Sequence, residues 1–272
     1  RDYKVTGVQT CALPISDVDL MILHDGRAGR IVADLARRIL QELFDAGLQV
    51  GQSVRTVAEA VKLAAGDATI YSTLTECRLI AGNAELPERL ATRLAALARR
   101  SSRRLVERLV EARREEAEKF GQTVALLEPN VKRSTGGLRD IQLVRWLGFT
   151  AWGSPSFDEL AHMGALSRRD ADSLRDAAEF LLRLRNELHL AASKANDDLT
   201  RDEQVRIAAA RGIESQDGLL GVERFMREYF RHTRQVARVL EGVIHRSRRR
   251  PRSRRLVAGI VGHRVDGLFR VG

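Results

Sequence analysis

The chain has 272 residues, of which 44% are hydrophobic, and its formal net charge is +10. This length and apolar content suffice for one large or two smaller domains with a packed core. No apolar run approaches the roughly 20 residues that a membrane span needs, and no signal peptide is recognisable. Cys11 and Cys77 are too few for a disulfide framework and lack the spacing of a zinc site. The composition therefore predicts a soluble cytoplasmic protein that does not bind membranes.

The positive charge is concentrated near the end of the sequence. The stretch HRSRRRPRSRR at 245–255 holds seven arginines, which leaves +3 of the +10 for the rest of the chain. Such a run can bind nucleic-acid phosphates, but the remaining body is only mildly basic, and codon usage can equally produce an arginine-rich chain. We expect 246–272 to be a basic linker, and the composition disfavours nucleic acid as a partner.

In chain order, residues 1–15 come first and show neither periodicity nor a capping pattern, so we interpret them as a foreign or artefactual leader. A buried strand is predicted for 18–23, ending at the turn His24-Asp25-Gly26. Apolar residues at helical spacing then predict an amphipathic helix over 30–44, laid on a sheet. A second strand follows at 48–54, and the pattern from Thr56 to Glu59 is that of a capping box, which begins a helix.

The remainder of the sequence has the 3.6-residue periodicity of helices, interrupted by Gly, Pro, Asn and Asp. The predicted helical segments are 57–65, 68–81, 86–119, 138–149, 156–162, 168–195, 201–211 and 221–247. The pattern therefore predicts an α+β protein, in which a small α/β unit precedes an α-helical domain.

Two aspartates occupy the start of the first predicted strand, SDVDLMIL at 16–23. Residues i and i+2 of a strand point to the same face, so Asp17 and Asp19 present adjacent carboxylates that repel each other unless a cation lies between them. Asp45, before the second strand, is placed to be a third ligand. Such a set can hold two Mg²⁺ ions roughly 3.5–4 Å apart for phosphoryl or nucleotidyl transfer. A solvated pair at a strand end is the alternative interpretation.

Several spaced segments resemble the amino-terminal half of the bacterial PII uridylyltransferase/uridylyl-removing family. They are SDVDLMIL at 16–23, FDAGLQVGQSVRT at 44–56, LTECRLIAGN at 74–83, LEPNVKRSTGGLRDIQLVRWLGF at 127–149, RLRNELHLAASKANDDLT at 183–200 and VERFMREYFRHTRQVARVL at 222–240. The resemblance implies a polymerase-β-like nucleotidyltransferase that transfers UMP from UTP to the nitrogen-regulatory PII protein, with Mg²⁺ held by Asp17, Asp19 and Asp45. It implies a partial nucleotidyltransferase domain at 16–125 and a helical companion domain at 126–245.

The sequence departs from this family at the nucleotide site. The family enters its Asp-x-Asp strand from a glycine-rich segment that cradles the triphosphate, and here the leader at 1–15 takes that place. Gln49 and Gln52 stand where relatives often have acidic and histidine residues. The family's metal-dependent hydrolase domain, which removes UMP, and its glutamine-sensing domains lie beyond the matched region. We therefore expect this chain to transfer UMP poorly or not at all.

Candidate nucleotide-binding residues are Ser16, Lys132 and Arg139. The stretch Lys132-Arg133-Ser134-Thr135-Gly136-Gly137 precedes a predicted helix, whose N-terminus offers free N–H groups to a phosphate. Alternatively, the two glycines only allow a tight turn, and the residue order is not that of a P-loop.

Three polar residues of the segment 168–195 lie on neighbouring turns of one predicted helix: Arg185, Asn186 and His189. They could touch the nucleotide or PII, but the pattern favours a polar network between helices. Two rival functions also remain. One is a non-catalytic helical module that binds PII or nucleic acid. The other is an adenylyltransferase, because Asp-x-Asp chemistry acts on phosphates and does not recognise the base.

Overall fold

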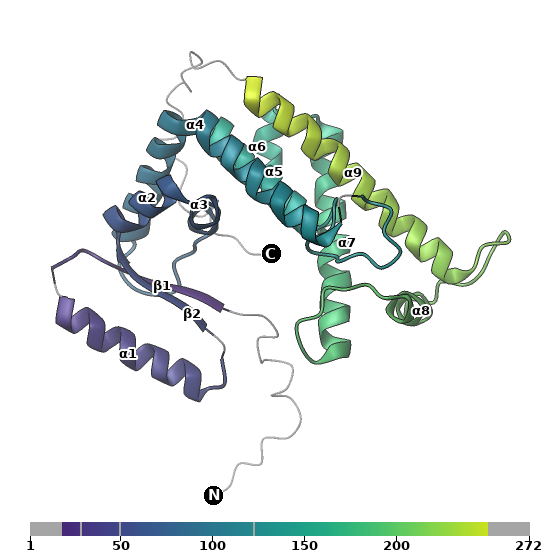
Figure 1. Cartoon of the computed structure of the whole chain (residues 1–272), viewed down its shortest axis with the longest axis horizontal. Coiled ribbons are helices and arrows are strands. Elements are labelled where there is room, and N and C mark those ends of the chain that lie inside the picture. The colour runs from purple at the N-terminus through teal and green to yellow at the C-terminus, as the bar shows by residue number, and fades with distance from the viewer. Residues whose placement is uncertain (1–17, 28, 49, 122, 250–272) are drawn as a thin grey trace, which may run out of the picture.

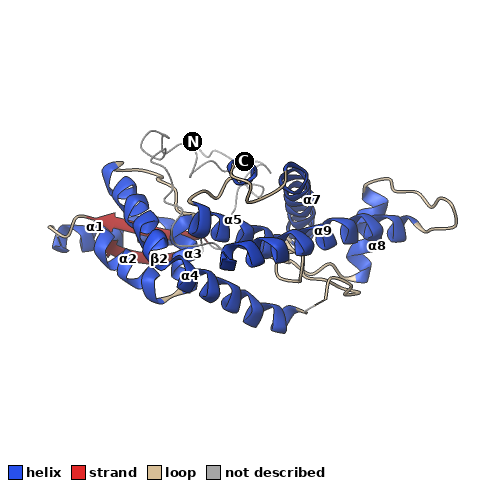
Figure 2. Cartoon of the chain, turned by 90° about the horizontal axis from the view of Figure 1, so that it is seen from above, coloured by secondary structure: helices blue, strands red, loops and turns tan. Residues whose placement is uncertain are grey.

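A computed structural model describes residues 18–249 except 28, 49 and 122. Figure 1 shows a small unit of two strands and one helix at one end, joined to a larger body of helices. Figure 2 shows that strands occur only in that small unit of the described chain. The predicted α+β class is confirmed.

The small unit is a parallel strand pair joined by a helix. Strand β1, Val18–His24, pairs with β2, Val50–Thr56, in a register that runs from Val18 opposite Val50 to His24 opposite Thr56. Helix α1, Gly29–Asp45, connects them and lies on one side of the strands, with the helical body on the other. A parallel pair requires such a crossover connection.

The prediction of a buried first strand is wrong. Asp19 is exposed, and the apolar residues that follow it in β1 are only half-buried. The described sheet has two strands, so each of them is an edge strand. Helix α1 packs through Ala36 and Leu40, whereas Ile31 at 73% and Leu35 at 51% remain exposed.

The second strand leads directly into α2, Val57–Gly66, through the predicted capping box. The Thr56 hydroxyl accepts a hydrogen bond from the Glu59 N–H (3.2 Å), and the Glu59 carboxylate accepts one from the Thr56 N–H (2.8 Å). This reciprocal pair satisfies two N–H groups that the start of a helix leaves free, and it confirms the predicted helix start.

Helix α3, Ala68–Thr75, is capped by the Asp67 carboxylate and is shorter than the predicted segment 68–81. Its last turn tightens, and the Glu76 N–H donates to the Thr73 carbonyl at 3.1 Å. The chain then leaves the helix, and the Glu76 carboxylate accepts a hydrogen bond from Trp146 Nε1 (2.9 Å). A tertiary contact thus fixes the residue that periodicity alone placed inside the helix.

The remaining helices follow the predicted segments closely. They are α4, Glu85–Phe120; α5, Leu138–Trp152; α6, Phe157–His162; α7, Arg168–Ala192; α8, Arg201–Ala210; and α9, Gly221–Arg249. Helix α4 changes direction at Ser101, whose backbone is not helical. Helix α9 extends into the stretch 246–272 that was predicted as a linker, and the rest of that stretch lies outside the described residues.

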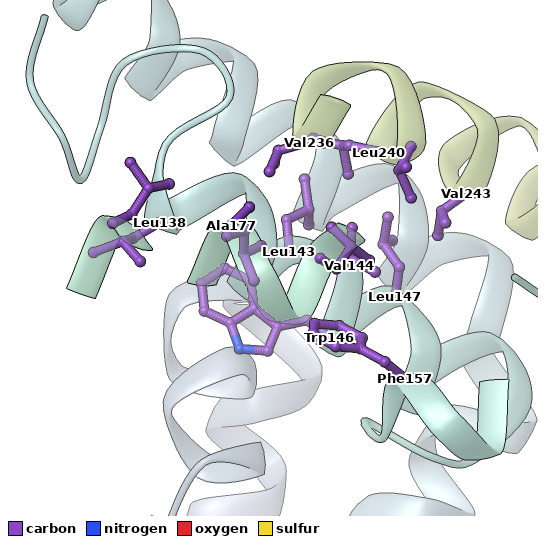
Figure 3. Close-up of a cluster of buried hydrophobic side chains, with 14 of the residues drawn as sticks. Leu138, Leu143, Val144, Trp146, Leu147, Phe157, Ala177, Val236, Leu240 and Val243 are labelled. Atoms are coloured by element: carbon purple, nitrogen blue, oxygen red, sulfur yellow. The ribbon is translucent and has the colours of Figure 1, made fainter. Parts of the chain in front are cut away.

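Helix α5 is the centre of the helical body. Leu143, Val144 and Leu147 are fully buried, and α4, α7 and α9 pack around this helix. Figure 3 shows α5 side chains facing Val236 and Leu240 of α9. Burial of each such leucine contributes about 1.5–3 kcal/mol. One hydrophobic cluster extends from α2 to α9 across the predicted domain boundary at 125/126, so the division into 16–125 and 126–245 remains a prediction.

None of the described helices has the length and apolar character required to span a membrane.

Candidate functional site

Two of the three predicted metal ligands lie in the described chain. Asp19 is the second residue of β1, opposite Gly51 of β2, and its side chain is exposed. Asp45 is the last residue of α1, is also exposed, and precedes the start of β2 by five residues. Because the strands are parallel, both carboxylates lie toward the edge at which the strands begin.

The third ligand, Asp17, lies outside the described residues, together with Ser16 and Gln49. Within the described ranges, which do not include Asp17, no three His, Cys, Asp or Glu side chains converge to hold a metal ion. The exposed carboxylates of Asp19 and Asp45 are oxygen donors of the type that Mg²⁺ prefers. The metal site therefore stays a prediction.

The backbone N–H groups at the start of α5 are not free to bind a phosphate, which disfavours the phosphate-loop interpretation. Four of them donate to acceptors in the loop or in α5: Gly136 to the Asp140 carboxylate (2.6 Å), Gly137 to the Ser134 carbonyl (2.9 Å), Leu138 to the Val131 carbonyl (3.1 Å) and Arg139 to the Lys132 carbonyl (2.8 Å). An anion near this loop would have to bind side chains.

The two glycines of the loop serve close packing. Gly136 has φ +81°, and a Cβ at this position would lie 2.2 Å from the Thr233 carbonyl oxygen of α9. A Cβ at Gly137 would lie 2.6 Å from the Val131 carbonyl oxygen. At position 136 only glycine fits both the positive φ and the close approach to α9, which supports the tight-turn interpretation.

A buried ion pair fixes the same loop to α4. The Arg113 side chain is only 7% exposed, and its Nε donates to Asp140 Oδ1 at 2.6 Å. Its Nη2 donates to the carbonyl of Arg133 at 2.9 Å. Burial raises the pKa of the Asp140 carboxyl, while the Arg113 guanidinium and the Gly136 N–H oppose that rise. Arg113 thereby joins α4, the loop and α5.

Arg113 was not among the residues predicted from the sequence, although its position on α4 carries a signal. Leu105 and Leu109 are buried on α4, and Arg113 continues their four-residue spacing onto the same face. A charged residue on an apolar helical face indicates a buried partner, since an unpaired buried charge is costly.

A second polar network joins α7 to the segment before α8. Asp197 Oδ1 accepts hydrogen bonds from Arg185 Nε (2.6 Å) and from His189 Nε2 (2.8 Å). The Asp197 carbonyl also accepts the N–H of Val131 at 2.7 Å, which ties this network to the loop before α5. For Arg185 and His189, the structure thus shows a polar network that links neighbouring segments.

This network predicts a pH-dependent stability. Burial acts to raise the pKa of the Asp197 carboxyl, but the hydrogen bonds from Arg185 and His189 outweigh it and lower that pKa. A carboxyl with a lowered pKa in the folded state stabilises the fold above its ordinary pKa of about 4, and this contribution is lost as the pH falls through the lowered value.

We therefore expect Asp197→Asn to reduce the free energy of unfolding at pH 7, and the difference from the wild type to shrink at acid pH. Urea unfolding at a series of pH values between 7 and 3 measures this difference. If the difference in unfolding free energy between the wild type and Asp197→Asn stays constant over the whole pH series, the proposed stabilisation by the ionised Asp197 carboxylate is contradicted.

Comparison with known proteins adds to this geometry. Residues 104–244 match the family model described as GlnD PII-uridylyltransferase. The chain is 37% identical over 235 residues to the bifunctional uridylyltransferase/uridylyl-removing enzyme of Pseudomonas fluorescens (strain SBW25). It is 38% identical over 233 residues to the enzyme of the same name from Pseudomonas aeruginosa (strain LESB58). Each match covers 85% of this chain and 26% of the relative. The enzyme of the same name from Azotobacter vinelandii is 36% identical over 228 residues, covering 84% of this chain and 25% of the relative.

The chain is an α+β protein with a small parallel unit ahead of a helical body, and the family model covers more than half of its length. It belongs to the GlnD PII-uridylyltransferase family. The chain spans about a quarter of the length of the curated relatives that it matches.

Proposed function

We propose that this chain is part of a cytoplasmic, Mg²⁺-dependent enzyme that transfers UMP from UTP to the PII protein. The family match over 104–244 is the observation that carries this proposal. The exposed Asp19 and Asp45, at the edge where two parallel strands begin, agree with it. In this reaction an acceptor group of PII forms a bond to the α-phosphorus of UTP, and pyrophosphate leaves.

The acidic side chains have a defined task in this proposal. Asp17, Asp19 and Asp45 would hold Mg²⁺, which supplies charge neutralisation for the triphosphate. The exposure of Asp19 and Asp45 leaves both carboxylates accessible to a nucleotide from solvent. Asp19 lies within a hydrogen-bonded strand, so its backbone position is fixed before any ligand binds.

The experiment is transfer of radiolabelled UMP to purified PII by the whole chain in the presence of Mg²⁺. We expect Asp19→Asn to abolish the transfer, and Asp34→Asn to leave it unchanged, because Asp34 pairs with Arg37 on the exposed side of α1. An arm with radiolabelled ATP separates uridylyl from adenylyl transfer. Equal incorporation by the wild type and Asp19→Asn would refute the proposed role of Asp19.

The rate is expected to be low for this chain. Residues 1–15 carry no Gly-Gly-x-Gly-Arg segment before Ser16, and loss of such triphosphate positioning can cost about 10²-fold in rate. A version with that segment placed before Ser16 is expected to transfer UMP faster in the same assay. Equal rates from the two versions would show that the segment contributes nothing to positioning.

A further inference from the structure

Lys132 is a half-buried cation without a partner in the described part of the chain. No described residue forms a hydrogen bond or an ion pair with its ammonium group, although its backbone carbonyl is bonded to the Arg139 N–H. Burial, followed by the nearby charges of Arg185 and Arg139, lowers its pKa, and Asp197 opposes the shift. Partial burial of an unpaired ammonium among other cations destabilises the fold unless an anion binds there.

The surroundings of Lys132 have more positive than negative charge. Three cations, Arg185, Arg139 and Arg133, act on the Lys132 ammonium group, against one carboxylate, Asp197. That carboxylate is already paired with Arg185. Arg133 and Arg139 share the Glu116 carboxylate with Arg113.

The arginines beside Lys132 are held in place before any ligand arrives. The Nε–H of Arg185 donates a hydrogen bond to Asp197 Oδ1 (2.6 Å). The two terminal nitrogens of Arg185 form no hydrogen bond within the described chain. The Nη1–H of Arg139 donates a hydrogen bond to Gln142 Oε1 (3.0 Å), and the Arg139 guanidinium lies 5.7 Å from the centre of the Trp146 ring. A fixed guanidinium binds an anion at a lower entropic cost than a free one.

We propose that Lys132, Arg139 and Arg185 form a binding site for a polyphosphate anion, either free pyrophosphate or the phosphate tail of a nucleotide. Asp197 is a positioning residue, because it holds Arg185 and, through its carbonyl, the loop that carries Lys132. The site uses side chains, since the backbone N–H groups from Gly136 to Arg139 at the start of α5 are already bonded. Only the link to UTP rests on the proposed function.

The first experiment is calorimetric titration of the whole chain with pyrophosphate, UTP and uridine, each without Mg²⁺. We expect Lys132→Gln and Arg185→Gln to weaken pyrophosphate binding by about tenfold or more, since a hydrogen bond to a charged group contributes about 1.5–3 kcal/mol. Arg183→Gln is the matched control, because Arg183 lies on the same helix but pairs with Glu179 on the exposed surface. Uridine is expected not to bind.

Binding of UTP alone, still dependent on Lys132, would assign the site to the phosphate tail of a nucleotide. Binding of pyrophosphate as well would show that the phosphates suffice. Equal affinities of the wild type and Lys132→Gln, or no binding of either phosphate compound, would overturn the proposal.

A second readout separates this site from a purely structural role. Because Lys132 has no partner in the described chain, Lys132→Gln is expected to preserve or raise the melting temperature, whereas pyrophosphate should raise it only in the wild type. Pyrophosphate binding in Asp19→Asn should match the wild type. If pyrophosphate binding depends on Lys132 but no UMP is transferred, the proposed function is refuted and the binding site is supported. If UMP is transferred but pyrophosphate binding does not depend on Lys132, the binding site is refuted and the proposed function is supported.

Discussion

Replacement of Asp140 by asparagine is expected to lower the free energy of unfolding by about 3–5 kcal/mol, because it leaves the Arg113 guanidinium buried without its counter-charge. The carboxylate is only 5% exposed and also accepts the Gly136 N–H, so two contacts are damaged together. Urea unfolding followed by circular dichroism at pH 7 measures the loss. Asp172→Asn is the control, since Asp172 forms an exposed pair with Arg175, and a midpoint close to the wild type is expected.

A double-mutant cycle tests whether the Arg113–Asp140 contact itself causes the loss. We expect Arg113→Met combined with Asp140→Asn to cost clearly less than the sum of the two single losses, because the double variant leaves neither charge buried alone. Strict additivity would mean that the two side chains do not depend on each other, contrary to the 2.6 Å hydrogen bond.

Replacement of Gly136 by alanine is expected to destabilise the protein by about 2–5 kcal/mol, the sum of left-handed backbone strain and overpacking. The added Cβ would lie 2.2 Å from the Thr233 carbonyl oxygen, so either the loop or α9 has to move. The same unfolding measurement applies.

Gly164→Ala separates the two causes. Gly164 also has a positive φ, +71°, but a Cβ there would meet nothing within 4 Å. We expect it to show only the strain of about 1–2 kcal/mol. Equal losses for the two variants would mean that the contact between the loop and α9 contributes nothing.

Much of the secondary structure could be predicted because local signals determine it. The capping pair Thr56 and Glu59 and the alternation of apolar residues located β2 and α2. The end of α3 could not be predicted in this way, since Glu76 is held by Trp146 from a helix seventy residues away. Burial of β1 was overestimated because an apolar run indicates a hydrophobic strand but not whether other strands pair with it on both sides.

The candidate site was predictable only in its residue types. The pattern around Gly136 suggested a phosphate loop, yet the Asp140 carboxylate and neighbouring carbonyls already bind its N–H groups. Such pairing depends on tertiary contacts that a linear pattern does not contain. The surroundings of Lys132 were likewise hidden, because Arg185 and Asp197 reach it from α7 and from the segment that follows.

The link between the loop before α5 and the segment before α8 has a consequence for how the protein folds. Asn130 pairs with Asp198 across 68 residues, and Leu199 donates its N–H to the carbonyl of Pro129. Closing a loop of that size costs entropy that the local helices do not, so this contact is expected to form late. During synthesis, Lys132 and Arg185 can therefore be brought to their final positions only after residue 199 has left the ribosome.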